Sequence, residues 1–287
     1  MGGSSLVAGP GRARLGLTAT ARAIGGASLK WDPAKYVEFG NHRDRPFFDL
    51  TARVHAESPR HVVDLGCGPG NLTATLAERW PAARVVGVDS SAEMLRMATV
   101  HSAQAANLSF TLQDITDWRP SESTDVVVSN AALQWVPGHP ALLAGWLEAL
   151  APGAWFALQV PGNFRSPSHV LMRQLAESGR WKDTLDGVLR HDDAVAEPAS
   201  YLNIMLDAGC DADAWETTYQ QVLHGPDPVL EWVRGAGLRP ILAALKPEEA
   251  AEFEAEYSAM LRDAYPATAH GTVFPFRRIF AVARKRR

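Results

Sequence analysis

HVVDLGCGPGNLT, residues 61–73, combines an apolar strand-like run, a glycine-rich turn and the start of a helix. The apolar run ends at Asp64, and Gly66, Gly68 and Gly70 then alternate with other residues. Glycine permits positive φ angles and a close approach of the backbone to a ligand. The stretch therefore predicts a ligand-binding loop between a strand and a helix, although a glycine-rich turn without a ligand would look similar.

Two common phosphate-binding loops do not match this stretch. A Walker loop requires a lysine followed by serine or threonine, and residues 61–73 contain no lysine. A dinucleotide fingerprint requires its third glycine three positions after the second, where this chain has Asn71. A carboxylate at Asp64 would also repel a pyrophosphate. The loop suits a ligand with a cationic amine and no phosphate, and S-adenosylmethionine has this chemistry.

Strand-like and helix-like segments alternate after residue 60. Strands are expected at 61–66, 83–89, 108–114, 124–130 and 153–161, and helices at 71–81, 91–102 and 139–150. Such alternation is typical of a doubly wound, mostly parallel α/β sheet. Outside this region we expect two short helices within 31–54, a mixed polar segment at 162–200, a helix at 198–210, a strand at 214–224, a helical lid insertion at 226–270 and a last strand at 272–285.

Polar residues follow the second and third expected strands. In an open parallel sheet, ligands bind at the carboxyl ends of the strands. Asp89 would accept hydrogen bonds from both ribose hydroxyls of a nucleoside. Its alternative role is to cap the helix that begins near Ser91, but Ser90 could serve as that cap without Asp89. Asp114 would accept from the adenine amino group with Ile115 against the ring, and its alternative is an ordinary loop acid.

The fourth strand ends in SNAALQW, which would place Asn130 and Ala131 under the methionine end of the ligand. Together, DLGCGPG, VVGVDSS, LQDIT and VVVSNAALQW resemble the successive motifs of class I S-adenosylmethionine-dependent methyltransferases over about residues 60–161. The resemblance implies a seven-stranded, Rossmann-like sheet whose last strand is antiparallel. The segment TVFPFRRIFAVARK fits that last strand.

A second resemblance extends over nearly the whole chain from Trp31. The segments WDPAKYVEFGNHRDRPFFDL, SNAALQWVPGH, QVPGNFRSPSH and VFPFRRIFAVA resemble the trans-aconitate 2-methyltransferase subfamily. This resemblance implies esterification of one carboxylate of a small polyacid, with trans-aconitate as the expected acceptor. It also implies S-adenosylmethionine as the cofactor, S-adenosylhomocysteine as its product and no metal.

The resemblance implies cofactor-binding residues at positions that match the motifs, namely Asp64, Gly66, Cys67, Gly68, Asp89, Ser90, Met94, Asp114, Ile115, Asn130 and Ala131. For Met94 a core position is an equal alternative, and we expect Cys67 to fill space rather than act as a nucleophile. Tyr36 and Arg45 lie in N-terminal helices that cover the cofactor in such enzymes. Arg45 would meet the methionine carboxylate, and its alternative is a solvated surface position.

No catalytic residue is expected, because a carboxylate with a pKa of about 4 is already ionised at neutral pH and needs no general base. The two remaining carboxylates of a tricarboxylate favour arginine partners. The candidate substrate residues are Arg43, Arg165, Arg277 and Arg278, with Trp135, Asn163, Trp232 and Tyr265 shaping the pocket. Adjacent strand residues point to opposite faces, so at most one of Arg277 and Arg278 faces the site.

His139 is the candidate base if the acceptor is not a carboxylate. It precedes Pro140 at an expected helix start, which favours a surface or capping role. The nine histidines form no metal-ligand spacing on a helix, which disfavours a metal-dependent mechanism.

Composition narrows the remaining classes. The net charge of −4 gives no footprint for nucleic acid, no apolar run reaches membrane-spanning length, and two cysteines suit a reducing cytoplasm. Residues 1–30 contain four basic residues and no acid, and we expect a disordered extension rather than a targeting peptide. We expect a cytoplasmic monomer acting on a small polycarboxylate. The alternatives are a methyltransferase for another small carboxylate or hydroxyl, a non-catalytic cofactor-binding protein and a dehydrogenase.

Overall fold

The computed structural model describes residue 1 and residues 40–189, 194–235 and 237–287. Contacts between Cα positions separate residues 1–30 from residues 31–287, and the fold below is that of the second unit. The expected extension at 1–30, the helix expected before residue 40 and Tyr36 lie outside the described residues. The side chain of Arg43 lies outside them as well.

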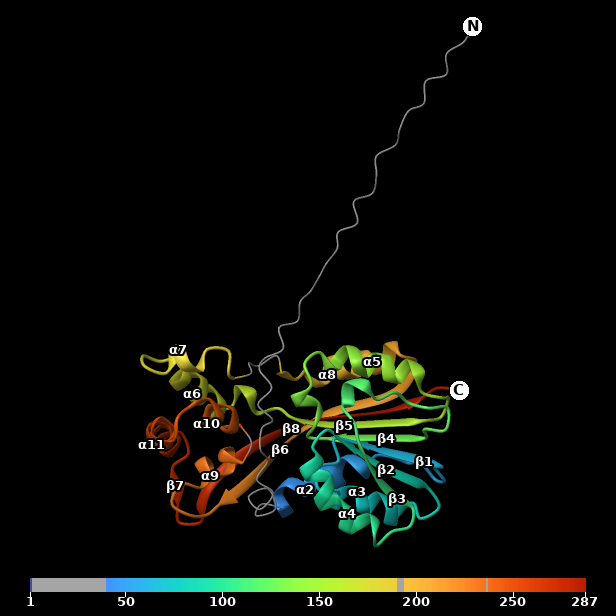
Figure 1. The fold of residues 1–287 in the computed structure, drawn as a ribbon, viewed down its shortest axis with the longest axis horizontal. Coiled ribbons are helices and arrows are strands. Elements are labelled where there is room, and N and C mark those ends of the chain that lie inside the picture. Colours follow the sequence, from blue (N-terminus) through green and yellow to red (C-terminus); the bar gives the residue numbers. More distant parts are fainter. Residues whose placement is uncertain (2–39, 190–193, 236) are drawn as a thin grey trace. The chain divides into compact units, whose positions relative to one another are not determined.

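One mixed sheet forms the centre of this unit, with the strand order β3-β2-β1-β4-β5-β8-β6 (Figure 1). Its strands are β1 (His61–Leu65), β2 (Arg84–Asp89), β3 (Leu108–Leu112), β4 (Val126–Asn130), β5 (Trp155–Pro161), β6 (Cys210–Leu223) and β8 (Gly271–Lys285). Strands β1 to β5 run parallel, whereas β8 is antiparallel to β5 and β6. The expected doubly wound fold with an antiparallel last strand is confirmed. An eighth strand, β7 (Ala267–Thr268), adds a short pairing with β8 to the expected seven.

Helices connect the parallel strands and then gather in the second half of the chain. They are α2 (Gly40–Thr51), α3 (Asn71–Arg79), α4 (Ala92–Ser102), α5 (His139–Ala149), α6 (Pro167–Ala176), α7 (Lys182–Leu185), α8 (Pro198–Asp207), α9 (Pro228–Arg234), α10 (Arg239–Ala244) and α11 (Pro247–Ala264), with 3-10 turns η1 (Ile115–Asp117), η2 (Leu133–Trp135) and η3 (Asn163–Arg165). In the described part of the chain, none of these helices has the length and apolar character that crossing a membrane requires.

Apolar side chains cover both faces of the sheet. Trp146 of α5 and Tyr201 of α8 pack on one face, and Phe47 of α2 and Leu76 of α3 pack on the other. Figure 1 shows α5 and α8 on one side of the sheet and α2, α3 and α4 on the opposite side. Because both faces are covered, residues 126–129 of β4 are all buried, which explains the continuous apolar run in the sequence.

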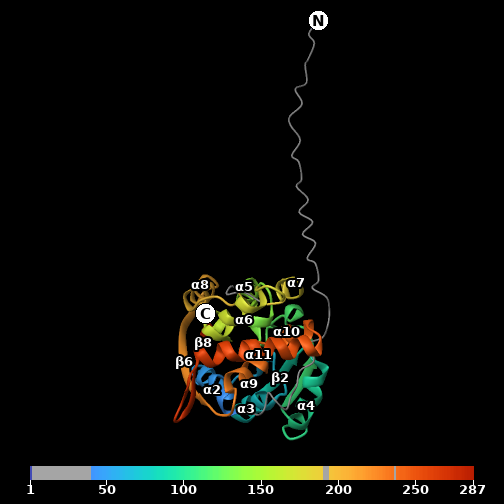
Figure 2. The ribbon, with the colours of Figure 1, turned by 90° about the vertical axis from the view of Figure 1, so that its left-hand side faces the viewer.

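Strands β6 and β8 form a long antiparallel pair, which we call the β6–β8 hairpin although helices connect the two strands, and this pair extends past the rest of the sheet. Strand β5 pairs with β8 only over residues 278–284, whereas β6 pairs with β8 over residues 272–285. The projecting part of the hairpin carries an apolar cluster that includes Phe274 of β8, Trp232 of α9 and Phe253 of α11. Figures 1 and 2 show α6, α7, α9, α10 and α11 gathered around this end of the hairpin.

The segment 162–200, to which the sequence assigned no helix, contains α6 and α7. Ser166 precedes α6 and Pro167 is its first residue, a position where the missing proline N–H costs nothing. Helices α9, α10 and α11 occupy residues 226–265, which were expected to be helical.

Candidate active site

The glycine loop folds back onto the end of β2. The backbone N–H groups of Gly66 and Cys67 both donate to the carbonyl oxygen of Val88, at 2.8 and 3.0 Å. The N–H of Gly68 donates to Asp89 Oδ2 at 2.9 Å. These bonds bring the loop after β1 and the acid at the end of β2 together, as the sequence predicted.

The three loop glycines all have positive φ, and two of them are also required by space. A β carbon on Gly66 would lie 2.2 Å from Cβ of Ala132, and one on Gly70 would lie 2.6 Å from the ring of Phe110. Gly68 is different, because among the described residues other than its two chain neighbours no atom lies within 4 Å of the position its β carbon would take. The backbone at Gly68 therefore borders open space that a ligand can approach.

Asp64 is a buried acid beneath this loop. Its side chain is 3% exposed, and its Oδ2 accepts a hydrogen bond from the Thr73 hydroxyl at 2.7 Å. Its pKa is raised from 3.8 to about 7, chiefly by burial; the Thr73 bond acts to lower the pKa, and the Asp89 charge acts to raise it. A cation bound beside Asp64 would favour the ionised form and reverse part of this shift.

Asp89 is half-buried and uses both carboxylate oxygens. Oδ2 accepts from Gly68, and Oδ1 accepts from the N–H of Ser91 at 2.8 Å. The hydroxyl of Ser91 caps α4 by accepting from the N–H of Met94. The expectation that Ser90 is the alternative cap was therefore wrong by one residue, because the first helical turn begins one position later; Ser90 is exposed.

Three further candidates near the strand ends differ in exposure. Asp114 is exposed, and its Oδ1 accepts from both the N–H and the hydroxyl of Thr116. Ile115 and Met94 are buried, at 8% and 4% exposure. Burial also raises the pKa of the Cys67 thiol far above its ordinary value, which makes its thiolate unavailable at neutral pH.

The end of β4 lies next to the glycine loop. Asn130 has a buried Oδ1 with no hydrogen-bond partner among the described residues. Ala131 adopts a positive φ of 53°. Buried polar atoms are normally paired, so the Asn130 oxygen is suited to a donor from a bound molecule.

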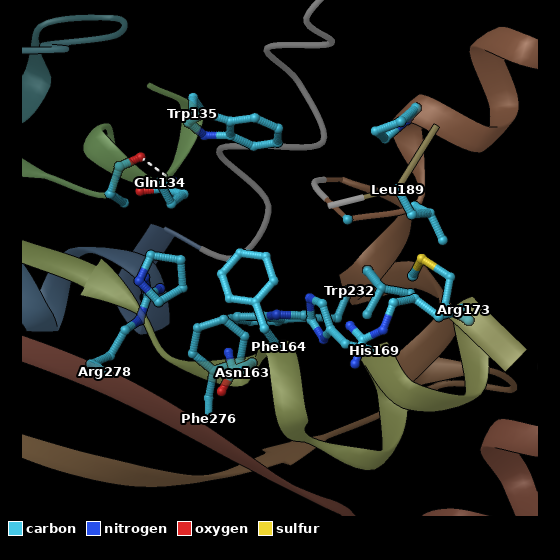
Figure 3. A pocket seen from close by; sticks show the side chains of 16 residues that line it. Gln134, Trp135, Asn163, Phe164, His169, Arg173, Leu189, Trp232, Phe276 and Arg278 are labelled. Atoms are coloured by element: carbon cyan, nitrogen blue, oxygen red, sulfur yellow. Dashed lines mark hydrogen bonds between the residues drawn. The ribbon is translucent and has the colours of Figure 1, made fainter. Parts of the chain in front are cut away.

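A pocket adjoins this strand end (Figure 3). Aromatic side chains form much of its wall, namely those of Trp135, Phe164, Trp232 and Phe276. Basic side chains also line it, namely those of His169, Arg173 and Arg278. In Figure 3, Arg278 and Arg173 reach it from different sides, from β8 and α6, with the Phe164 ring between them. None of the described residues that line this pocket is acidic.

Of the expected substrate residues, Trp135, Asn163, Trp232 and Arg278 line this pocket. Arg278 is only 5% exposed, and its guanidinium carbon lies 4.4 Å from the centre of the Phe276 ring. Its neighbour Arg277 points elsewhere and binds the carboxylates of Glu197 and Glu216. The prediction that at most one of the two arginines faces the pocket agrees with this placement.

Among the candidates whose side chains the structure describes, Arg165, Arg277 and Tyr265 do not line this pocket. The side chain of Arg165 is 70% exposed and lies 3.9 Å from Glu197. The hydroxyl of Tyr265 accepts a hydrogen bond from the N–H of Ser168 and so joins α6 to the end of α11. Asn163, inside the pocket wall, accepts from the N–H of Arg277 through Oδ1, at 2.7 Å.

Arg45 lies on the exposed side of α2. Its guanidinium carbon is 4.8 Å from the centre of the Tyr219 ring in β6, and its Nε is 3.8 Å from Asp49. The Tyr219 hydroxyl also donates to Asp49, at 2.6 Å. These contacts place Arg45 in a cluster between α2 and β6, and its expected contact with a methionine carboxylate stays a prediction.

His139 is buried, at 2% exposure, and is not the surface or capping residue that we expected. Its Nε2 lies 2.6 Å from the Tyr201 hydroxyl, and its Nδ1 lies 3.2 Å from the carbonyl oxygen of Val136. Gly138 is the residue before the helix, and α5 turns the imidazole toward α8. Burial lowers the pKa of His139, so the ring is neutral at physiological pH, and it does not line the pocket.

The contribution of α6 to this pocket was not predicted from the sequence. His169, Met172 and Arg173 line it together because positions i, i+3 and i+4 of a helix share one face. The signal was the serine–proline pair at 166–167 followed by helically spaced apolar residues. Gln134, four residues after the end of β4, also lines the pocket and was not predicted to do so.

Comparison with known proteins identifies the family. A family model described as a methyltransferase domain matches residues 62–153. The trans-aconitate 2-methyltransferase of Streptomyces avermitilis is 55% identical over 260 residues, covering 89% of this chain and 97% of that protein. That of Streptomyces coelicolor is 57% identical over 263 residues, covering 89% and 86%. The YcgJ protein from Bacillus subtilis shares the fold, with a TM-score of 0.56 at 12% identity over 86% of this chain and 99% of that chain. The chain therefore belongs to the trans-aconitate 2-methyltransferase family.

Proposed function

We propose that this protein transfers a methyl group from S-adenosylmethionine to one carboxylate of trans-aconitate. The observation that carries the proposal is the pocket at the end of β4, which is lined by Arg173, Arg278 and His169 and by no acid among its described residues. Guanidinium groups bind carboxylates through paired, charge-assisted hydrogen bonds. The curated relatives described above bear the name of this activity.

The glycine loop and the neighbouring strand ends fit the proposed cofactor. When bound, S-adenosylmethionine would supply a sulfonium methyl group, whose carbon an acceptor oxygen can attack while the carbon–sulfur bond breaks and S-adenosylhomocysteine leaves. Asp64 would hold its ammonium group, and the unpartnered Oδ1 of Asn130 would accept a hydrogen bond from the same end. The open backbone at Gly68 would lie along the ligand, with Asp89 at the ribose and Asp114 at the adenine.

Two arginines would hold the acceptor. Arg278 projects from β8 and Arg173 from α6, so each would bind one carboxylate of a tricarboxylate. The third carboxylate would then lie toward Ala131 at the end of β4, next to the glycine loop. This arrangement predicts that a polyacid binds more tightly than a monoacid, because a monoacid would leave one arginine without a carboxylate partner.

The chemistry requires alignment and the exclusion of water. An ionised carboxylate needs no base, and the neutral, buried His139 outside the pocket is consistent with that. Trp135, Phe164 and Trp232 cover the pocket with apolar surface. Trp232 belongs to α9, so α9, α10 and α11 would act as the lid. A dry pocket favours a reaction in which an anion and a cation become two neutral groups.

The test is to incubate the purified protein with S-adenosylmethionine and trans-aconitate and to detect the methyl ester by mass spectrometry. A panel containing citrate, cis-aconitate, small monoacids and phenols provides the comparison. We expect one methyl ester of trans-aconitate as the main product. Methylation of a phenol or monoacid without any ester of trans-aconitate would refute the acceptor. Tight cofactor binding with no product across the panel would support a non-catalytic binding protein instead.

Substitution of the pocket arginines tests the binding mode. Arg278→Gln and Arg173→Gln should each raise the KM for trans-aconitate by about 10–100-fold, the effect of losing a charge-assisted hydrogen bond. The affinity for S-adenosylhomocysteine should stay within twofold of the wild type. Arg165→Gln is the matched control, because it removes the same charge from an exposed side chain outside the pocket. An equal KM effect in the control would attribute the change to overall charge.

The proposal includes a monomer that works in the cytoplasm. Both cysteines are free and buried, as is typical of a reducing compartment. Light scattering at micromolar concentration should give the mass of one 31.1 kDa chain. A mass near twice that value would contradict the monomer.

A further inference from the structure

The turn after β4 contains a strained residue. Ala131 has a φ of 53°, and it is the non-glycine residue with a positive φ in the described part of the chain. The left-handed region disfavours an L-residue with a β carbon by roughly 5–30-fold. Such a conformation persists only where the surrounding structure holds it, and residues of this kind concentrate at functional sites.

Hydrogen bonds hold Ala131 from both sides. Its N–H donates to the carbonyl oxygen of Gln159 at 2.9 Å, directly after the last β4–β5 register pair. Its carbonyl oxygen accepts from Nε2 of Gln134 at 2.6 Å. Gln134 is buried, at 6% exposure, and this bond lies partly buried in the wall of the pocket. The first bond belongs to the sheet, whereas the second depends on one side chain.

The same turn touches both parts of the site. Cβ of Ala132 lies against Gly66, where an added β carbon would be only 2.2 Å away. Ala131, Gln134 and Trp135 line the pocket with the arginines. A change in the turn would therefore shift the glycine loop relative to this pocket, which would hold the acceptor acid and which we call the acid pocket. Methyl transfer is sensitive to such shifts, because a misplacement of about 1 Å can reduce the rate about 100-fold.

We infer that Gln134 is a positioning residue, which holds Ala131 in its left-handed conformation and so fixes the distance between the glycine loop and the acid pocket. The expected effect of Gln134 on kcat rests on the proposed function. Its structural consequence, the support of a strained residue by one side chain, is independent of the acceptor. Gln134 acts through the carbonyl of Ala131 and needs no contact with the acid.

A double-mutant cycle tests this role. Gln134→Met keeps the length of the side chain and removes its donor, and Ala131→Gly removes the strain that the donor offsets. The cycle consists of the wild type, both single variants and the double variant. Gln174→Met is the matched control, because it makes the same exchange at an exposed position of α6. The readouts are kcat, the KM for the acid, the calorimetric Kd for S-adenosylhomocysteine, and Tm.

Gln134→Met should lower kcat by roughly 10–100-fold, while the KM for the acid and the Kd for S-adenosylhomocysteine change less than threefold. The same exchange should lower Tm by about 1–6 °C. In the Ala131→Gly background both effects should shrink, because glycine keeps the left-handed conformation without the glutamine. The double variant should therefore regain at least tenfold in kcat over Gln134→Met. Gln174→Met should match the wild type.

Two results would overturn the inference while leaving the proposed function standing. One is a kcat of Gln134→Met within twofold of the wild type. The other is a raised KM that Ala131→Gly does not rescue, which would mean that Gln134 contacts the acid directly. If the wild type esterifies no acid, the proposed function fails, and the Tm values then decide the inference. Additive Tm effects of the two substitutions would overturn it, and a smaller effect of Gln134→Met in the glycine background would support it.

Discussion

Replacing Asp64 by asparagine should stabilise the protein at alkaline pH while weakening its affinity for the cofactor. Folding raises the pKa of Asp64 from 3.8 to about 7, chiefly through burial. The folded state therefore keeps a proton that the unfolded state releases. In the wild type the protonation of Asp64 in the folded state contributes to the free energy of unfolding. This contribution is complete below about pH 4 and is lost as the pH rises through about 7. An asparagine side chain does not titrate, so the variant does not lose it.

The size of the effect follows from the pKa shift. A change from 3.8 to about 7 corresponds to an upper bound of about 4 kcal/mol in the free energy of unfolding. The difference between Asp64→Asn and the wild type should be near zero at pH 4 and should approach this bound at pH 8. Asparagine has the same shape, and its oxygen can still accept the Thr73 hydroxyl bond. All other titrating groups are shared, so they cancel in the difference.

Urea unfolding followed by tryptophan fluorescence at pH 5 and pH 8 measures this difference. Asp117→Asn, at an exposed position in η1, is the matched control and should show no comparable gain. Calorimetry at pH 8 should show S-adenosylhomocysteine binding at least tenfold more weakly to Asp64→Asn, whereas methylthioadenosine, which lacks the amino acid end, should bind as before. If the variant gains no more stability at pH 8 than at pH 5, the account of a costly buried carboxylate is refuted. Unchanged binding of S-adenosylhomocysteine would remove Asp64 from the amine site.

Three further substitutions or treatments have defined outcomes. Gly66→Ala should cost about 3 kcal/mol or more in unfolding free energy, because the added β carbon meets Ala132 at 2.2 Å and the backbone has a positive φ; urea unfolding measures it, and a loss below 1 kcal/mol would contradict the steric account. His139→Ala should lower the free energy of unfolding by about 2–3 kcal/mol, because the bond between His139 and Tyr201 is lost. Its kcat should fall less than tenfold, whereas loss of a general base would lower kcat by roughly 10²–10⁴-fold. Cys67 should resist iodoacetamide at pH 8 until the protein is unfolded, because burial raises its pKa; rapid labelling of the native protein in a mass spectrum would contradict this.

The parts of the structure that depend on neighbouring residues were predictable from the sequence. The glycine loop and the acids near the carboxyl ends of the first three strands are local patterns, and the valine-rich strands are apolar because both sheet faces are covered. The observed strand and helix limits in residues 61–161 lie within a few residues of the expected ones. The preference for a ligand with a cationic amine over one with a phosphate was also predictable, because it depended only on Asp64 and on the spacing of three nearby glycines.

The acid pocket was less predictable because distant elements build it. Its arginines come from α6 and β8, and which of Arg277 and Arg278 faces inward depends on the register between β5 and β8. Because side chains alternate between the two faces of a strand, the sequence predicted that only one of these arginines could face the pocket, but not which one. Arg173 was missed because its helix begins inside a polar segment and was not recognised. His139 was placed wrongly because packing against α8, which no local pattern encodes, buries its ring.

The position of β8 between β5 and β6 has a consequence for how the protein is made. Residues 271–285 are synthesised after the other described strands, yet they pair with both β5 and β6. Until they leave the ribosome, the fourteen-residue β6 has no partner, and the helices between β6 and β8 have no hairpin to pack on. The finished sheet thus depends on a strand that is made after both of its partners. A nonsense mutation within the codons for β8 should be as damaging as one much earlier in the gene.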